Sequence, residues 1–388
     1  MQMNDREVRL AALSTEVGAP ALGRLPKVDF QTAMRAAAPS VTSLVRLMFV
    51  AARLNRGPGG LSPAEFFSHR LWDPLFGRGD LQRFVGLSGQ GRFHAACCDI
   101  AWKAIADDKI LSTALLEAAG VEALPQTLAV VHPHRRLDGK LAIRSPEDLL
   151  HLLRSPLSYP LVAKPIDGVF SVGVINAVVV DPATDMIQSV TGATSPVSDA
   201  AERIMAHPGG YLIQRALQPP TLIASMSGGR LCSVRVLVLL TRAGPVLHRA
   251  ALKVPLSGNV ADNYWRPGNR LGAIELTSGQ VFRVVTGTAQ DLRRDPFHPE
   301  TGAPIEGMAI PEWSALRELV MTVAPLFPGI RTQSWDVALT DRGPVLLEIN
   351  WGGDLHLHQF AHGEGILDPI FCDHLRECGY RGTLPARE

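Results

Sequence analysis

The stretch 334–353, SWDVALTDRGPVLLEINWGG, decides the fold. Two apolar runs flank the turn residues 341–344 (DRGP), and this order predicts an antiparallel hairpin. Because side chains alternate along a strand, Glu348 and Asn350 point to the same face of the second strand. Asp336 stands near the start of the first strand, where strand pairing can bring it beside them. The hairpin can therefore collect three oxygen-bearing side chains on one face.

Carboxylate and amide oxygens in such a group suit a magnesium ion. Mg²⁺ takes hard oxygen ligands, usually one or two carboxylates, and completes its shell with waters and phosphate oxygens. The alternative is that Asp336, Glu348 and Asn350 are polar residues on the solvent face of a hairpin. The run 344–351 (PVLLEINW) is very apolar for an exposed edge, so its polar groups need partners. We therefore predict a nucleotide-linked Mg²⁺ site on these three residues.

An acidic residue on one strand followed by Glu-x-Asn on the next resembles the ATP-grasp superfamily. More narrowly, three segments resemble the sugar-transfer-associated ATP-grasp group, relatives of α-L-glutamate-ligase-like enzymes: 334–353, HRLWDPLF at 69–76, and the segment that begins at Lys109. The resemblance covers roughly residues 65–370. It implies an α+β ATP-grasp fold, in which two α+β lobes clasp Mg-ATP. The first 60 residues lie outside the resemblance, and their pattern predicts a mostly helical N-terminal region.

The resemblance implies two phosphate-binding lysines, Lys109 and Lys164. Either alone could be a solvated surface residue, but Lys164 lies in the apolar segment PLVAKP, where an unpaired ammonium is costly. The following segment 167–174 (DGVFSVGV) resembles the loop that covers the phosphates, and a plain β-turn is the alternative. Its candidate nucleotide contacts are Gly168, Phe170 and Ser171.

The segment 211–217 (YLIQRAL) resembles the strand that leads into the interlobe hinge, where main-chain groups bind adenine. Its candidate contacts are Gln214, Ala216 and Leu217. Relatives often carry an acidic residue where Gln214 stands, which leaves the polar contact at this position open.

Four further residues are implied to act on phosphate or on the acceptor. Arg235 is a lone charge in the apolar run CSVRVLVLL and matches a phosphate-facing arginine, and a snorkelling edge residue is the alternative. Lys253 and Asn263 match the segment that precedes the metal-binding strands, as does Arg270, which we take as a substrate contact. We expect the first three to be catalytic.

The histidine-rich segment 354–362 (DLHLHQFAH) follows the hairpin. Zinc binding has little support because no H-E-x-x-H pattern is present, and structural histidines are the alternative. Its position makes His356, His358 and Gln359 candidate acceptor-site residues.

Composition narrows the partners. The 38 Lys and Arg against 37 Asp and Glu leave a net charge of +1, so neither nucleic acid nor an anionic membrane is indicated. The apolar run 41–54 contains Arg46 and Arg53 and is too short to span a bilayer. We see no export signal, and five cysteines without a C-x-x-C pattern suit a reducing cytoplasm. The oligomeric state is open, with a homodimer as one option.

We divide the chain into four parts, which are a helical extension (1–60), a helical linking region that precedes the ATP-grasp lobes (61–157), a small lobe (158–217) and a large lobe with the Mg²⁺ site (218–388). Strands are expected at 159–165, 174–180, 211–216, 233–240, 246–254, 335–339 and 345–349, and helices at 197–206 and 312–326.

The expected function is that of a Mg-ATP-dependent carboxylate–amine or carboxylate–thiol ligase acting through an acyl phosphate. Its cofactors are ATP and Mg²⁺, and its substrates are small-molecule, peptide-linked or glycan-linked carboxylates and amines. The resemblance suggests a setting of glycan, cell-surface polymer or peptide modification. The alternatives are a kinase of a small molecule or sugar and a catalytically silent nucleotide-binding scaffold.

Overall fold

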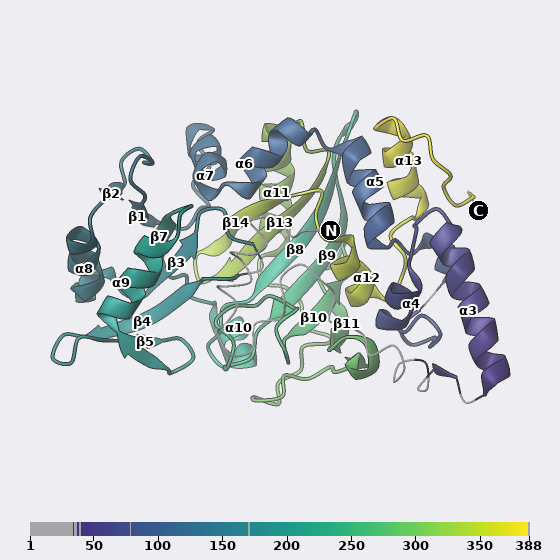
Figure 1. The fold of residues 1–388 in the computed structure, drawn as a ribbon, viewed down its shortest axis with the longest axis horizontal. Helices are drawn as coiled ribbons and strands as arrows, with labels where there is room; N and C mark the ends of the chain where they lie inside the picture. Colours follow the sequence, from purple (N-terminus) through teal and green to yellow (C-terminus); the bar gives the residue numbers. More distant parts are fainter. Residues whose placement is uncertain (1–33, 35–36, 39, 78, 170, 387–388) are drawn as a thin grey trace.

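The computed structural model describes residues 34, 37–38, 40–77, 79–169 and 171–386. Much of the predicted extension 1–60 and the predicted loop residue Phe170 lie outside this part. Within it, two seven-stranded sheets and their helices form a mixed α+β fold, as predicted. Figure 1 shows the two sheets side by side, with α6 (Lys103–Asp107) and α7 (Lys109–Ala118) above the place where they approach.

The first sheet is formed by the middle of the chain. Its strand order is β2 (Leu141–Ile143), β1 (Thr127–Val131), β7 (Tyr211–Arg215), β3 (Leu161–Pro165), β4 (Ile175–Asp181), β5 (Met186–Ser189) and β6 (Thr194–Pro196). The β1–β2 pair is parallel, and the other neighbouring pairs are antiparallel. Helices α8 (Pro146–Arg154) and α9 (Val197–Ala206) share its apolar core. Because the sheet begins at Thr127, part of the predicted region 61–157 belongs structurally with the predicted small lobe.

The second sheet contains the predicted hairpin. Its order is β12 (Arg293–Arg294), β11 (Val281–Thr286), β10 (Arg270–Ile274), β9 (Gly244–Val254), β8 (Ser233–Thr241), β13 (Thr332–Thr340) and β14 (Gly343–Trp351), and each neighbouring pair is antiparallel. One face packs in a large core with α11 (Trp313–Val323), α13 (Pro369–Glu377) and α5 (Leu87–Cys97). Helix α12 (Leu355–His362) packs against the other face of β9, β10 and β11. The other α-helices among the described residues are α3 (Val41–Arg56), α4 (Pro63–Ser68) and α10 (Thr221–Ser227).

Helix ends follow local sequence signals. Ser62 and Glu65 form the reciprocal bonds of a capping box at the start of α4. At the start of α8, Ser145 accepts from the Asp148 N–H, but the Asp148 carboxylate accepts from the Ser145 hydroxyl and not from its backbone. That cap therefore has only one of the two reciprocal bonds of a capping box. Helix α7 ends just before Gly120, which has a φ of +77° and so adopts a conformation that favours glycine.

The predicted strands correspond to β3, β4, β7, β8, β9, β13 and β14, with ends displaced by a few residues at most. The predicted ranges do not include β1, β2, β5, β6, β10, β11 and β12. The segment 197–206 is α9, and 312–326 is α11 followed by a short 3-10 turn. The 354–362 segment, which sequence alone could not assign to strand or helix, forms α12.

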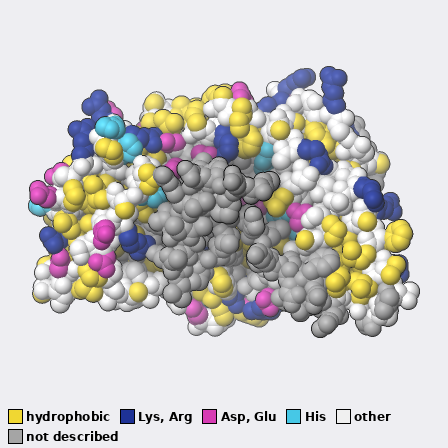
Figure 2. Space-filling model, in the orientation of Figure 1, with side chains coloured by type: hydrophobic (Ala, Val, Ile, Leu, Met, Phe, Trp, Pro, Cys, Tyr) yellow, Lys and Arg dark blue, Asp and Glu magenta, His cyan; other side chains and the backbone are white. Residues whose placement is uncertain are grey.

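No helix within the described ranges is both long enough and apolar enough to cross a bilayer. On the face drawn in Figure 2, Lys and Arg side chains lie at several separate places, with acidic side chains between them. This scattered charge agrees with the near-zero net charge of the chain. Any dense group of cations must therefore be a local feature.

Candidate active site

Strand alternation places charged residues on one face of the second sheet. On β8, Val234 and Val236 enter the core that contains α11, whereas Arg235 between them points to the opposite face. The same alternation turns Asp336 away from the core that buries Trp335 and Val337, its neighbours on β13. Lys253 points to the same face from β9, between the core residues Leu252 and Val254. Three apolar strands thus carry one polar row.

Register brings this row together. Asp336 pairs with Arg235 on one side and with Glu348 on the other. The register of β13 and β14 shifts by one residue directly after the Asp336–Glu348 pair, which leaves Leu347 as a bulge. Bulges bend a strand and re-aim its side chains, and they are frequent beside active sites. The predicted ligand Asn350 lies two residues along β14, opposite Ser334.

Asp336 is the electrostatic centre of the row. Arg235 donates two bonds to it, Nε to Oδ1 at 2.6 Å and Nη2 to Oδ2 at 2.7 Å, and Lys253 Nζ lies 3.0 Å from Oδ1. Burial alone would raise the pKa of Asp336, but the positive charges of Arg235 and Lys253 outweigh it and hold the pKa well below its ordinary value. The carboxylate is therefore ionised at neutral pH. Lys253 also pairs with Asp262, at 3.5 Å.

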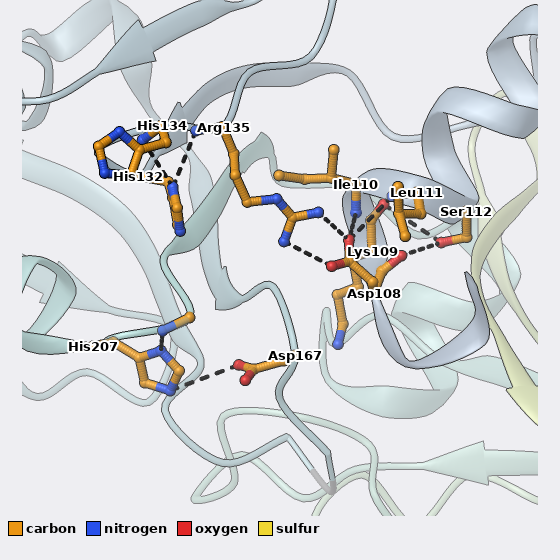
Figure 3. Close-up of polar contacts among 11 residues, drawn as sticks. Asp108, Lys109, Ile110, Leu111, Ser112, His132, His134, Arg135, Asp167 and His207 are labelled. Carbon is orange, nitrogen blue, oxygen red and sulfur yellow. Dashed lines mark hydrogen bonds and ion pairs between the residues drawn. The ribbon is translucent and has the colours of Figure 1, made fainter. Parts of the chain in front are cut away.

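Lys109 enters the site from the first turn of α7. The side chain of Asp108 caps this helix by accepting from the Ile110 and Leu111 N–H groups, and Arg135 pairs with the same carboxylate at 2.6 Å. Figure 3 shows this arrangement around Asp108, with Lys109 beside it. Lys109 Nζ donates to the Gly168 carbonyl at 2.6 Å and lies 3.9 Å from Glu348 Oε2.

Lys164 is the second predicted phosphate lysine. It lies on β3 and is only partly exposed, and its ammonium has no hydrogen bond or ion pair with any of the described residues. Burial, and then the positive charge of Lys109, lowers its pKa to about 8, although Glu348 and Asp336 act in the opposite direction. An ammonium in this position gains from an anionic ligand.

The predicted covering loop bridges the two sheets. Ser171 has a φ of +58°, and its carbonyl accepts from Arg266 Nη2 at 3.0 Å, so the loop after β3 is tied to the segment before β10. A Cβ on Gly168 would lie 2.9 Å from Pro165 Cβ, so only glycine fits without a shift. Asp167, at the start of the loop, lies 4.0 Å from His207 Nε2 (Figure 3).

The predicted hinge follows β7. Gln214 is buried and donates to Thr127 Oγ1 at 3.3 Å, while the Ala216 N–H donates to the Pro160 carbonyl at 3.0 Å. A cavity of about 380 Å³ opens here and is lined by Gln214, Ala216 and Leu217 together with Lys164.

A second cavity, of about 400 Å³, lies on the side of α6 and α12. It is lined by Arg235, Asn263, Asn350 and His356. The two cavities share several walls: Lys109, Gly168, Ser171, Val172, Lys253, Asp336 and Glu348. We call the first the hinge cavity and the second the outer cavity. The cation–carboxylate row stands where they meet.

Three residues predicted as substrate contacts line neither cavity. Arg270 is buried and pairs with Asp295 at 2.6 Å. Gln359 is buried and exchanges two bonds with the Val85 backbone, of 2.7 and 2.8 Å. His358 is completely buried in α12. Helical periodicity turns these last two inward, so of the predicted residues on α12 only His356 reaches the outer cavity.

Sequence reasoning missed several residues of the outer cavity. Tyr264, Trp265 and Arg266 lie in the short segment NYWRPG directly after Asn263, where an aromatic pair beside an arginine was the available signal. Lys103 lines the same cavity from outside the motifs, and Asp354 lines it from the first position of the histidine-rich segment.

Comparisons with solved structures find two kinds of ligase. A D-alanine–D-alanine ligase from Bacillus anthracis is 15% identical with a TM-score of 0.39, and the match covers 76% of this chain and 77% of that one. An L-amino acid ligase from Bacillus licheniformis is 14% identical with a TM-score of 0.34, over 64% of this chain and 40% of that one. This chain thus spans about two fifths of that ligase. These likenesses are too distant to carry an argument about function.

No curated protein matches the chain. The family model described as sugar-transfer associated ATP-grasp matches residues 92–370, which is most of the chain and nearly all of the expected 65–370 region. The chain therefore belongs to the sugar-transfer-associated ATP-grasp family.

Proposed function

We propose that the protein is a Mg-ATP-dependent carboxylate ligase. In this proposal a carboxylate oxygen attacks the γ-phosphorus of ATP, the bond from that phosphorus to the bridging oxygen breaks, and ADP leaves. An amine or thiol then attacks the acyl carbon, loses its proton and displaces inorganic phosphate. The observation that carries the proposal is the meeting of two cavities at one row of cations and carboxylates.

The hinge cavity supports the nucleotide half. Its walls combine the β7 hinge with Lys164, whose ammonium has no anionic partner among the described residues. Lys109 stands between the two cavities and is held in place by the cap at Asp108. Two lysines in the wall of one cavity favour a ligand that carries several negative charges. A nucleoside triphosphate is such a ligand.

The row on the second sheet supports the transfer step. Arg235 and Lys253 are fixed on neighbouring β-strands within 3.0 Å of Asp336, so their positive charges need little reorganisation during a reaction. Preorganised charges of this kind are usually the largest contribution to catalysis of phosphoryl transfer. No covalent enzyme nucleophile is required.

The oxygen donors fit Mg²⁺. Asp336 and Glu348 are register partners, and Asn350 donates its amide N–H to the Ser334 carbonyl at 3.4 Å, which leaves its amide oxygen for an ion. Mg²⁺ held by these three residues would neutralise charge on the phosphate oxygens.

The covering loop supports exclusion of water. Arg266 ties the loop to the second sheet at Ser171, and Lys109 ties it to α7 at Gly168. Shielding matters because an acyl phosphate is lost to hydrolysis if water reaches it before the amine does. The proposal includes a cytoplasmic setting and acids or acceptors linked to glycans or peptides, and the sugar transfer in the family description supports the glycan-linked class.

The test is ADP release from Mg-ATP with a panel of carboxylates, with and without hydroxylamine as a nucleophilic trap. We expect acid-dependent ADP release and hydroxamate formation in the wild type. Glu348→Ala should lose both, whereas Glu318→Ala, on the exposed side of α11, should keep both. Acid-dependent turnover that survives in Glu348→Ala contradicts the assignment. A phosphorylated alcohol without hydroxamate would identify a kinase instead.

A further inference from the structure

A group of sulfur and imidazole ligands lies outside the cleft, between α5 and the C-terminal helix α13. Cys97 is the last residue of α5, His374 lies in α13, and Cys378 caps the end of α13. His374 and Cys378 are four residues apart, so they share one side of the helix. Figure 1 shows α5 and α13 as neighbours on the side of the second sheet away from the first. The ligand atoms of all three residues lie within 4.8 Å of one another.

The separations suit a metal ion. A tetrahedral zinc ion with Zn–S of about 2.3 Å and Zn–N of about 2.0–2.1 Å holds its sulfur and nitrogen ligands roughly 3.5 Å apart. In the structure, Cys378 Sγ lies 3.6 Å from His374 Nε2. Thr332 Oγ1 lies 3.1 Å from the same nitrogen, on the β13 side. One nitrogen and two sulfur atoms are therefore close enough to bind one ion, and the Thr332 oxygen lies beside that nitrogen.

Burial favours a closed site with one entry. Cys97 and His374 are buried, whereas Cys378 is partly exposed and gives access from solvent. The other cysteines have plain backbone partners. Cys98 Sγ contacts the Thr332 carbonyl, Cys232 Sγ contacts the Arg230 carbonyl, and Cys372 Sγ contacts the Leu367 carbonyl. Cys97 and Cys378 thus lie together with a histidine, whereas the other three thiols contact backbone carbonyls.

We propose that Cys97, His374 and Cys378 bind one Zn²⁺ ion, with the Thr332 hydroxyl or a water in the fourth position. Binding replaces the thiol protons of Cys97 and Cys378, so two protons leave to solvent while two Zn–S bonds form. A site with two thiolates, one imidazole and one oxygen matches the borderline-soft character of zinc better than that of Mg²⁺. The site is independent of the proposed ligase chemistry.

The ion would fasten α13 to the wall of the outer cavity. The Cys97 carbonyl accepts from the Arg331 N–H at 3.0 Å, just before β13. Two residues after Cys97, the Asp99 carbonyl accepts from Trp351 Nε1 at 3.2 Å, and Trp351 lines the outer cavity. A zinc ion at the end of α5 therefore stabilises the short segment that supports this tryptophan.

The experiment uses the full chain, stripped with a chelator and kept under a phosphine reductant. Zn²⁺ is titrated against a chromophoric chelator, and Co²⁺ replaces it for absorption spectroscopy, because cobalt bound to thiolate gives a charge-transfer band in the near ultraviolet. We expect one equivalent of Zn²⁺ and a thiolate–cobalt band in the wild type. Cys378→Ser should weaken Zn²⁺ binding at least tenfold and reduce the band.

Two matched variants distinguish this site from a neighbouring thiol and from the cleft. Cys372→Ser removes a thiol of the same helix, and Glu348→Ala removes an oxygen ligand of the cleft, and both should bind Zn²⁺ as the wild type does. Cys378→Ser replaces a partly exposed residue, and its circular dichroism and melting without metal should match the wild type. If the wild type binds no stoichiometric Zn²⁺, or if Cys378→Ser binds it equally well, the proposal is overturned. Loss of binding in Glu348→Ala alone would do the same, since it would place the ion in the cleft.

Discussion

Proton uptake on nucleotide binding should report the environment of Lys164. Its pKa of about 8 in the ligand-free protein is lowered by burial and by Lys109. A phosphate beside the ammonium favours the charged form and should raise the pKa at least to the ordinary value of about 10.4. The sign is therefore uptake, because bound nucleotide makes Lys164 hold a proton that the free protein has partly released.

The size of the effect follows from the two pKa values. At pH 9, Lys164 would be roughly one tenth protonated in the free protein and almost fully protonated in the complex, so about 0.9 proton is taken up for each nucleotide bound. At pH 7 the uptake at this residue falls to about 0.1 proton. The phosphates of ATP, with a last pKa of about 6, do not titrate at pH 9.

Isothermal titration calorimetry measures this uptake directly. The protein is titrated with Mg-ATP at pH 9 in two buffers of different ionisation enthalpy, and the difference in observed heat gives the number of protons. Lys164→Arg is the matched control, because its guanidinium stays charged, so it should bind nucleotide without proton uptake. Binding by the wild type with no uptake at pH 9, or equal uptake by Lys164→Arg, would refute the reasoning.

Three further changes test other parts of the structure. Gly168→Ala places a Cβ 2.9 Å from Pro165 Cβ and should raise the KM for ATP by about tenfold, which corresponds to roughly 1.4 kcal/mol of binding free energy. The control Gly91→Ala, whose added Cβ would have no atom within 4 Å, should leave the KM unchanged. Equal KM values for the two variants in steady-state kinetics would contradict the steric argument. Gln359→Ala leaves the buried Val85 N–H and carbonyl without partners. It should lower the free energy of unfolding in urea titrations by about 1–3 kcal/mol without changing the KM. A changed KM at unaltered stability would instead make Gln359 a substrate contact. Asp336→Asn breaks a buried ion pair and should lower that free energy at pH 7 by about 3–5 kcal/mol. Because the folded pKa of Asp336 lies below the unfolded value, its contribution to stability is present above about pH 4 and is lost as the pH falls through the folded pKa. Asp336→Asn should therefore lose less stability on acidification than the wild type or the exposed control Asp341→Asn. Parallel pH profiles of the free energy of unfolding for all three proteins would contradict this assignment.

The hairpin shows what a sequence pattern can predict. Alternation in 334–353 fixed which side chains share a face, and the register places Asp336 opposite Glu348 as that pattern requires. The apolar run CSVRVLVLL with its single charge also predicted that Arg235 lies on one face of a strand, whereas Lys253 was predicted only from the family resemblance. The bulge at Leu347 could not be predicted, since it depends on pairing with β13 and not on a local signal.

The acceptor side was harder to predict for two physical reasons. Position just after the hairpin made His356, His358 and Gln359 equal candidates, but helix α12 turns successive residues by about 100°. All three side chains are buried, and of the three His356 alone lines the outer cavity. Strand β10, with a glycine at its centre and arginine at its start, has no clear alternation, so Arg270 could not be placed on a face in advance. Trp265 and Arg266 enter the cavity from a loop, where no periodicity guides an inference.

Transfer of oxygen from the acid to phosphate tests the central claim most directly. The carboxylate substrate identified by the panel is labelled with ¹⁸O, and the inorganic phosphate released with Mg-ATP and the amine is analysed by mass spectrometry. If an acyl phosphate forms, the carboxylate oxygen that attacked the γ-phosphorus leaves with it, so each phosphate carries one ¹⁸O from the acid. Unlabelled phosphate from a reaction that forms the amide would contradict the account.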